Sequence, residues 1–373
     1  MHKMFQYRLF PNKQQEASLY ETLEECRWLY NHLLANRKTA YEQRGERLSC
    51  YEQIDTFPIL KTERVTLKGV HSQVLQNVAV RVDLAFKAFF RRVREHAEEP
   101  GYPRFKGYGR YDSFTFPQSG FSITHDERVT LSKIGAVKMV YHRPIKGKIK
   151  TCTVQRSSTG KWYVCFSVEC EPERLEPIDT QVGIDVGLKT FAMLSTGEEI
   201  ANPKFFRKEE KALAKASRQL SKAEKGTPER HHKRKIVARV HERIKFRRDN
   251  FTHQESRQIV DHFDIIAVED LHVNRMTHNH CLAKSITDAA WSGFFDKLFS
   301  KAEEAGRTAI KVNPAYTSQD CSRCHHRQVM PLSERVYHCP CCLLVIDRDL
   351  NAALNIRALG LQGLGLSLEA PSL

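Results

Sequence analysis

The sequence predicts an α+β protein that contains more than one domain. Its 373 residues exceed the usual length of a single domain, which is roughly 150 residues. Apolar residues recur at helical spacing in some stretches and form short strand-like runs in others, which indicates both helices and strands. The composition is 41% hydrophobic and 28% charged, a balance typical of globular rather than disordered proteins.

The first hundred residues predict one short strand followed by helices. Residues 1–10 predict the strand, and Pro11 precedes the first helix. Residues 72–96 predict a second long helix, and a loop rich in Pro, Gly, aromatic and basic residues follows at 100–111. The apolar faces of the two helices carry Leu19, Leu23, Cys26, Tyr30 and Leu33, and Val74, Val78, Val82, Phe86, Phe89 and Val93.

Residues 114–170 change to short apolar runs that are separated by turn residues, a pattern typical of strands. A linker at 171–177 marks a domain boundary, and the Gly- and Leu-rich residues 358–373 are expected to be a disordered tail. The predicted strands are 114–116, 136–141, 149–155, 162–168, 182–194, 264–270 and 308–312.

The positive charge is strongly concentrated. Lys and Arg number 59 against 44 Asp and Glu, which gives a net charge of +15. Residues 204–248 contain 17 Lys and Arg, 5 Glu and no Asp, so +12 lies in this one segment. Gly226 to Pro228 interrupts it, and apolar residues recur at helical spacing on both sides, which predicts a basic helical hairpin. A solvated helix face usually mixes both signs, so this excess favours contact with a polyanion.

We expect that polyanion to be nucleic acid and not a membrane. The sequence has no run of 18 apolar residues that could span a bilayer, and its first residues lack the apolar core of a signal peptide. We therefore expect a cytoplasmic protein, in which the 11 cysteines stay reduced.

Five of the cysteines lie within 22 residues. Cys321 and Cys324 form one CxxC pair, Cys339 and Cys342 form another, and 14 residues separate the pairs. This spacing is close to that of a zinc ribbon, in which four thiolates hold a structural Zn²⁺ and leave no position open for water. Cys341 is too close to Cys339 to belong to the set. The other six are expected to be small core residues: Cys26, Cys50, Cys152, Cys165, Cys170 and Cys281.

Three acidic residues stand at the ends of predicted buried elements. Asp185 lies within an apolar run, Glu269 ends a strand, and Asp349 lies where a last helix begins. Carboxylates that converge repel one another unless cations neutralise them, and hard ions such as Mg²⁺ suit their oxygens. Two Mg²⁺ about 4 Å apart can activate water and stabilise the leaving oxygen of a phosphodiester. Taken singly, each acid has another explanation. Asp185 could cap a turn, and Glu269 could end its strand in a surface ion pair. Asp349 or the nearby Asp347 could cap the last helix.

Together these motifs resemble the TnpB family, RNA-guided nucleases that certain bacterial and archaeal insertion sequences carry. The resemblance covers about residues 1–357 and is more specific in the C-terminal half. It rests there on the order GIDVGLK, basic hairpin, VEDL, two CxxC pairs and IDRDLNAALNI. Looser matches in the N-terminal half are YRLFPNKQQ, CRWLYNHLL, SQVLQNV and GYPRFKG.

The resemblance implies an α+β multidomain architecture. A wedge β-barrel would contain an inserted helical recognition domain, and a RuvC-type nuclease domain of RNase H-like α/β fold would follow, interrupted by a zinc ribbon. The implied ranges are 1–10 and 106–180 for the barrel, 11–105 for the recognition domain, 181–313 and 344–357 for the nuclease domain, and 314–343 for the ribbon.

The resemblance also implies a function. Members use an RNA from the element's end as a guide, read a short flanking DNA motif with the protein and cut double-stranded DNA, here as an expected monomer. Asp185, Glu269 and Asp349 would be the catalytic residues that hold two Mg²⁺; all three are intact, whereas relatives that act as repressors lose one or more. Four cysteines would hold one structural Zn²⁺: Cys321, Cys324, Cys339 and Cys342.

Gln73, Gln76 and Asn77, on or beside the helix at 72–96, are candidates for the DNA flanking motif. Gln and Asn side chains can bond adenine edges with two hydrogen bonds. The alternative is that they form an ordinary polar helix face.

Other functions share part of this pattern. A miniature type V CRISPR effector would have the same site, although the compact length and the plain DRDLNAALNI favour TnpB. The intact acids argue against a guided repressor that does not cut, and no motif identifies the nucleophile that a transposase would need for strand transfer. One departure from the family is Leu343, which follows the second CxxC pair where glycine is usual. The turn there prefers a positive φ, so we expect the leucine to be strained.

Overall fold

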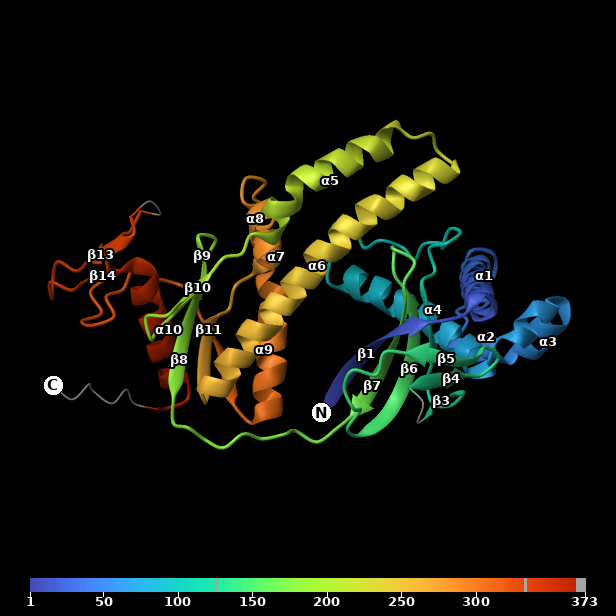
Figure 1. Ribbon diagram of the computed structural model, residues 1–373, viewed down its shortest axis with the longest axis horizontal. Helices are drawn as coiled ribbons and strands as arrows, with labels where there is room; N and C mark the ends of the chain where they lie inside the picture. The colour runs from blue at the N-terminus through green and yellow to red at the C-terminus, as the bar shows by residue number, and fades with distance from the viewer. Residues whose placement is uncertain (125–126, 332–333, 367–373) are drawn as a thin grey trace. The chain divides into compact units, whose positions relative to one another are not determined.

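The computed structural model describes residues 1–124, 127–331 and 334–366. The chain forms two compact units, Met1–Cys170 and Glu171–Leu373 (Figure 1). The division falls after Cys170 and not after residue 180, where the barrel domain was expected to end. The intervening segment bonds to the second unit: the Leu175 N–H donates to the Ala305 carbonyl at 2.9 Å, and the Ile178 N–H donates to Asp264 Oδ2 at 2.7 Å.

The first unit contains a seven-stranded antiparallel sheet in the order β2-β6-β7-β1-β5-β4-β3. The N-terminal strand β1 lies inside the sheet and pairs with β7 from His2↔Glu169 to Leu9↔Trp162. Within the described ranges, the edge strands β2 and β3 of this sheet do not pair with each other, and the expected wedge β-barrel stays a prediction. Strands β3 and β4 were not predicted. The strands are β1 (His2–Phe10), β2 (Ser113–Phe116), β3 (Phe121–Thr124), β4 (Arg128–Leu131), β5 (Gly135–Met139), β6 (Lys148–Arg156) and β7 (Trp162–Glu169).

Helices fill the segment between β1 and β2. The first begins at a capping box, in which Asn12 Oδ1 accepts a hydrogen bond from the Gln15 N–H and Gln15 Oε1 accepts one from the Asn12 N–H. Side chains of these helices and of the sheet form one hydrophobic core, so the predicted barrel and recognition domains pack as a single unit. The helices are α1 (Lys13–Arg44), α2 (Cys50–Asp55), α3 (Phe57–Glu63), the 3₁₀ helix η1 (Val65–Gly69) and α4 (Ser72–Arg94).

The second unit is built on a five-stranded mixed sheet in the order β10-β9-β8-β11-β12. Strands β8, β11 and β12 run parallel, and β9 and β10 continue the sheet antiparallel. The strands are β8 (Gln181–Val186), β9 (Thr190–Leu194), β10 (Glu199–Ala201), β11 (Ile265–Glu269) and β12 (Thr308–Val312). The helices are α5 (Phe205–Lys222), α6 (Pro228–His262), α7 (Val273–Met276), α8 (Ala283–Ala289), α9 (Trp291–Ala305) and α10 (Arg348–Gly363).

Helices cover both faces of this sheet. Ile266 and Val268 of β11 share a core with α6 and α9, whereas the intervening Ala267 packs against Ile356 of α10. Because successive strand residues point to opposite faces, α10 lies on the face opposite α6 and α9. This arrangement gives the unit its α/β character and brings α10 against the strands that carry two of the candidate acids.

Two predicted boundaries need correction at the C-terminal end. The ribbon includes β14 (Val345–Asp347), which pairs with β13 (Val336–His338), so it continues beyond residue 343. Helix α10 continues to Gly363, so residues 358–363 are helical and not disordered; residues 367–373 of the predicted tail lie outside the described residues. The helix persists because Gly360 lets it approach β11 and β12 closely: an added Cβ would lie 2.5 Å from the Cβ of Ala267.

Among the described residues, every helix is too short or too polar to cross a membrane.

Candidate functional site

A close contact between β8 and α10 positions Asp185 and Asp349. Gly183 of β8 faces the backbone of α10, and a Cβ at this position would lie 2.9 Å from the Cβ of Arg357 and still closer to two backbone atoms. Asp185 lies two residues farther along the same face of the strand, and Asp349 lies one helical turn before Ala353. Glycine at 183 therefore allows the approach that brings the two acids towards each other.

Glu269 reaches the same region from the neighbouring strand. Strands β8 and β11 are parallel, and their last paired residues are Ile184 and Val268. The next residue of each strand is an acid, so Asp185 and Glu269 lie side by side at the carboxyl ends of two adjacent strands. The Glu269 side chain is only 8% exposed, and its Oε1 accepts a 2.6 Å hydrogen bond from the Thr317 hydroxyl.

The electrostatics indicate that the three acids interact. Burial raises the pKa of Asp185 well above its ordinary value, and the charges of Glu269 and Asp349 raise it further. Burial also raises the pKa of Glu269, against the opposing effect of the Thr317 hydrogen bond. A bound cation would offset the cost of ionising these two carboxyls. A site of oxygen ligands for a hard divalent ion is expected to have this property.

Basic side chains and a helix cap hold the third acid. Asp349 pairs with Arg348 at 3.2 Å and with Arg335 at 3.5 Å. Asp347 accepts hydrogen bonds from the N–H groups of Asp349 and Leu350 and is the N-cap of α10, as one alternative for this residue predicted. Asp347 thus fixes the backbone that carries Asp349.

The predicted zinc ligands form a compact cluster. The Sγ atoms of Cys321 and Cys342 lie 3.6 Å apart, and those of Cys324 and Cys339 lie 3.5 Å apart. All four sulfur atoms lie within 4.8 Å of one another, and within the described ranges no other group of three or more metal-ligating residues is gathered so tightly. These separations exceed a disulfide bond and approach the sulfur spacing of a tetrahedral Zn²⁺ site with Zn–S bonds of about 2.3 Å.

The electrostatics favour ionisation of one cluster cysteine, Cys339, whereas the pKa values of the other three thiols are raised. Burial opposes ionisation of Cys339, but the backbone N–H groups of Cys342 and Cys341 and the neighbouring thiols outweigh it and lower its pKa to about 6. A thiolate is the form that binds zinc. Cys341 is exposed and outside the cluster, as expected. Leu343 adopts φ = 60° in the turn that follows, which confirms the positive φ expected there and identifies a strained residue.

Three polar residues that the sequence did not reveal connect the ribbon to the acids. Asn351 and Asn355 of α10 are buried, and both donate to the Asp320 carbonyl, at 2.8 and 2.7 Å. Asn355 also donates to the carbonyl of Thr317, the residue that bonds to Glu269. The signal was present as two Asn residues four apart in residues 350–356, which are otherwise apolar, a spacing that places both on one face of the helix.

The predicted basic hairpin is present as α5 and α6, with the break at Gly226 to Pro228 (Figure 1). Glu209 of α5 joins the helices through Arg243 and Arg247, at 3.0 and 2.9 Å. Thirteen of the 17 Lys and Arg residues between 204 and 248 are exposed. Most of the charge is therefore available to a polyanion and is not used to hold the hairpin together.

The three residues considered for DNA reading lie on the first turns of α4 and differ in availability. The Gln73 side chain accepts hydrogen bonds from the Ser119 N–H and hydroxyl, at 2.9 and 3.0 Å. Asn77 accepts from Arg81 at 3.1 Å. Gln76 is exposed. Intramolecular contacts thus occupy the oxygens of Gln73 and Asn77, whereas Gln76 faces solvent.

Comparison with protein-family models finds three matches along the chain. Residues 164–280 match a family described as "Probable transposase" (OrfB_IS605), residues 291–356 match "Cas12f1-like, TNB domain", and residues 1–46 match "Helix-turn-helix domain". In this structure, residues 1–46 form a strand and one 32-residue helix.

Curated relatives extend over nearly the whole chain. The "Putative RNA-guided DNA endonuclease" of Streptomyces pristinaespiralis is 33% identical over 96% of this chain and 89% of its own length. The "Putative RNA-guided DNA endonuclease InsQ" of Escherichia coli K12 is 30% identical over 95% and 92%. The "CRISPR-associated endodeoxyribonuclease Cas12f1" of Sulfoacidibacillus thermotolerans is 27% identical over 60% of this chain and 56% of its own length. Motifs, spacing and nearly full-length similarity lead to one conclusion: the chain belongs to the TnpB family.

Proposed function

We propose that this protein is an RNA-guided DNA endonuclease of an insertion sequence, and that it cuts DNA by Mg²⁺-dependent hydrolysis in a RuvC-like, RNase H-like domain. The observation that carries the proposal is the environment of Asp185, a half-buried carboxyl whose pKa is raised first by loss of solvent and further by the charges of Glu269 and Asp349. Such a cluster is costly unless it binds cations. The names of the near full-length relatives support the same function.

Asp185, Glu269 and Asp349 would hold two Mg²⁺, which when bound supply an activated water and stabilise the leaving oxygen of a phosphodiester. The chain's own groups would prepare this site. Thr317 orients Glu269 by its hydrogen bond, and Asp347 fixes the start of the helix that carries Asp349. Desolvation, together with repulsion from Glu269 and Asp349, raises the pKa of Asp185, so a bound cation would displace the proton that this carboxyl otherwise holds.

The four-cysteine cluster would hold one structural Zn²⁺. Four thiolates complete a tetrahedral site, so this ion would offer no position for water or substrate. Its role would be to hold the residues between Thr317 and Ser322, because α10 and the ribbon meet there through Asn351 and Asn355.

The basic hairpin would bind the phosphates of the guide RNA or of its duplex with DNA. Such contacts position a nucleic acid without reading its sequence, which base pairing would do. Gln76 is the best placed of the three candidates for the flanking motif, because it is exposed.

The alternatives are less well supported. The Cas12f1 relative matches only 60% of this chain, against 96% and 95% for the two RNA-guided endonucleases, so a miniature type V CRISPR effector is not favoured. A guided repressor would not need the three intact acids.

The experiment begins with the protein purified together with its RNA. Sequencing the RNA identifies the guide, and a duplex library that matches it next to randomised bases identifies the flanking motif. With Mg²⁺, wild-type protein is expected to cut the matched duplex, and Asp185→Ala is expected to bind it without cutting. Equal cutting by both proteins would refute the catalytic assignment, and binding without cutting by wild type would favour the repressor.

The hairpin is tested separately. Lys215→Gln with Lys222→Gln removes two exposed charges from α5, which should lower the dependence of nucleic-acid affinity on salt by about two units of slope at most. Lys38→Gln with Lys87→Gln, two exposed lysines of the first unit, controls for the change in net charge.

A further inference from the structure

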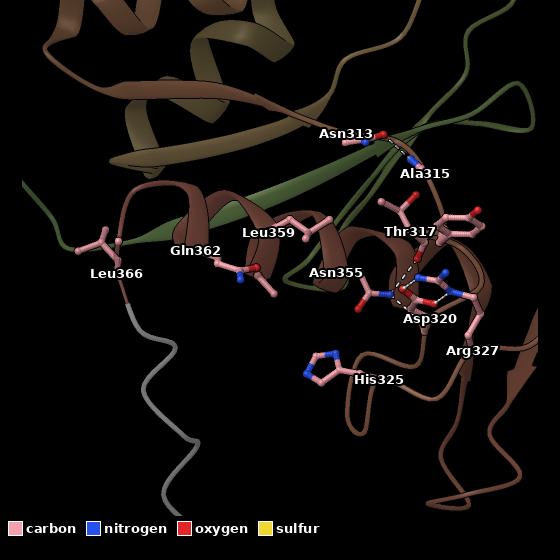
Figure 2. Close-up of a pocket in the computed structure, with 13 residues that line it drawn as sticks. Asn313, Ala315, Thr317, Asp320, His325, Arg327, Asn355, Leu359, Gln362 and Leu366 are labelled. Carbon is pink, nitrogen blue, oxygen red and sulfur yellow. Dashed lines mark hydrogen bonds and ion pairs between the residues drawn. The ribbon is translucent and has the colours of Figure 1, made fainter.

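A half-open pocket of about 810 Å³ lies between the first CxxC knuckle and the C-terminal half of α10 (Figure 2). Its size is within the range of small-ligand sites, roughly 300–1,000 Å³. Asn355, Leu359 and Gln362 follow one another along α10, and His325 approaches from the ribbon loop. Tyr316 also lines the pocket, so its walls are apolar, aromatic and polar in part.

One wall is formed by an arginine stacked against a tyrosine ring. The Arg327 guanidinium lies 3.7 Å from the centre of the Tyr316 ring, which is half-exposed. Asp320 fixes Arg327 in this position by two hydrogen bonds, of 2.6 and 2.9 Å. Stacked aromatic rings and guanidinium planes are the surfaces on which proteins hold unstacked nucleobases.

The backbone at two pocket residues is strained. Tyr316 has φ = 69° and His325 has φ = 58°, in the left-handed region that favours glycine. Such strain costs on the order of 1–3 kcal/mol and gathers at functional sites, because the surrounding contacts must hold it. Here both strained residues present large side chains to one cavity.

The free polar groups suit a base better than a phosphate. Asp320 already neutralises Arg327, so this wall offers no unpaired positive charge to an anion. In the described part of the chain, the side chains of His325 and Gln362 take no hydrogen bond, and Asn355 uses only its NH₂ group. Amide and imidazole groups pair with the edges of bases.

The pocket also touches the candidate active site. Thr317 lines it, and its hydroxyl donates to Glu269. We propose that this pocket holds one unstacked nucleobase of the DNA strand that is being cut, with Tyr316 as the stacking platform and His325, Gln362 and the Asn355 oxygen at the base edge. This inference rests on the proposed function. Seating a base here would fix the strand next to the three acids.

The first test is photo-crosslinking in the complete ribonucleoprotein. The Asp185→Ala protein, which leaves DNA intact, is bound to matched duplexes that carry a photoreactive pyrimidine or purine at each position near the cut. A DNA crosslink to the peptide containing Tyr316 is expected at one position. DNA bound without that crosslink, or a crosslink to the guide RNA instead, would overturn the pocket inference alone. Failure to bind matched DNA would overturn the proposed function, and this inference with it.

The second test separates stacking from structure. Tyr316→Ala is expected to slow cutting roughly 5- to 150-fold, the loss of one base–aromatic stack, whereas Tyr316→Phe keeps the rate within about twofold. When one particular nucleotide of the duplex is made abasic, wild-type protein should cut it more slowly by the same factor. The cutting rate of Tyr316→Ala should not change with that substrate. Tyr51→Ala removes an exposed tyrosine elsewhere and should change nothing. If the loss from Tyr316→Ala multiplied the loss from the abasic nucleotide at every position tested, the proposed base-binding pocket would be refuted.

Discussion

Gly183→Ala is expected to separate β8 from α10 and to disable the candidate active site. The added Cβ would lie 2.9 Å from the Cβ of Arg357, and closer still to the Ala353 carbonyl oxygen and the Arg357 nitrogen. Ordinary contact begins near 3.4 Å, so the two elements must move apart by at least about 0.5 Å, and on the order of 1 Å once the backbone atoms are accommodated.

The cost has two parts. Forcing a methyl group into this packed contact should lower the free energy of unfolding by about 1–3 kcal/mol. Because α10 carries Asp349 and β8 carries Asp185, the same shift misplaces one acid relative to the other. A misplacement of about 1 Å can cost on the order of 100-fold in rate, so cutting should fall by that factor in protein that is still folded.

The assay measures both parts in one preparation. Thermal unfolding gives the stability, and single-turnover cutting of matched duplex is measured well below the transition, after confirming that the protein still binds its RNA. Gly363→Ala is the matched control, because it lies on the same helix with nothing within 4 Å of an added Cβ. Wild-type stability and rate for Gly183→Ala would refute the packing argument; lost stability with unchanged cutting would refute the link to Asp349.

Three further predictions address the metals and the ribbon. Cys342→Ser should lose the roughly one zinc per chain that metal analysis finds in wild type, whereas Cys341→Ser should keep it; zinc-free wild type would refute the ribbon assignment. Leu343→Gly removes the strain of φ = 60°, worth about 1 kcal/mol, so it should hold zinc about fivefold more tightly against a chelator. Asp185→Asn should raise the Tm of metal-free protein, because ionising a carboxyl with a raised folded-state pKa costs stability. That gain should vanish below about pH 4, where Asp is protonated in both states, and grow as the pH rises through the raised pKa; a gain that ignores pH would contradict the argument.

Local patterns predicted the long helices α1, α4, α5 and α6 and most strands of the two sheets, but not α2, α3, α8 or α9. Pro11 and the spacing of apolar residues predicted α1, and the Gly226 to Pro228 break predicted the separation of α5 from α6. Short or half-exposed strands were missed: β3 alternates apolar and polar residues, but it is only four residues long and has no fully buried residue. The extent of α10 was missed because Gly and Leu at 359–366 resemble a low-complexity tail, while Gly360 is buried through its contact with β11 and β12.

The sequence by itself determined which chemistry the chain can perform: two CxxC pairs at ribbon spacing, acids at element ends and a hairpin with most of the positive charge. These are properties of residue type and local spacing. Only the tertiary structure decided that Gly183 lets Asp185 and Asp349 approach each other and that Thr317 bonds to Glu269. It also decided that Tyr316 and His325 share a pocket with α10. Each of these depends on contacts between segments tens of residues apart, and such contacts leave no periodic signal in the chain.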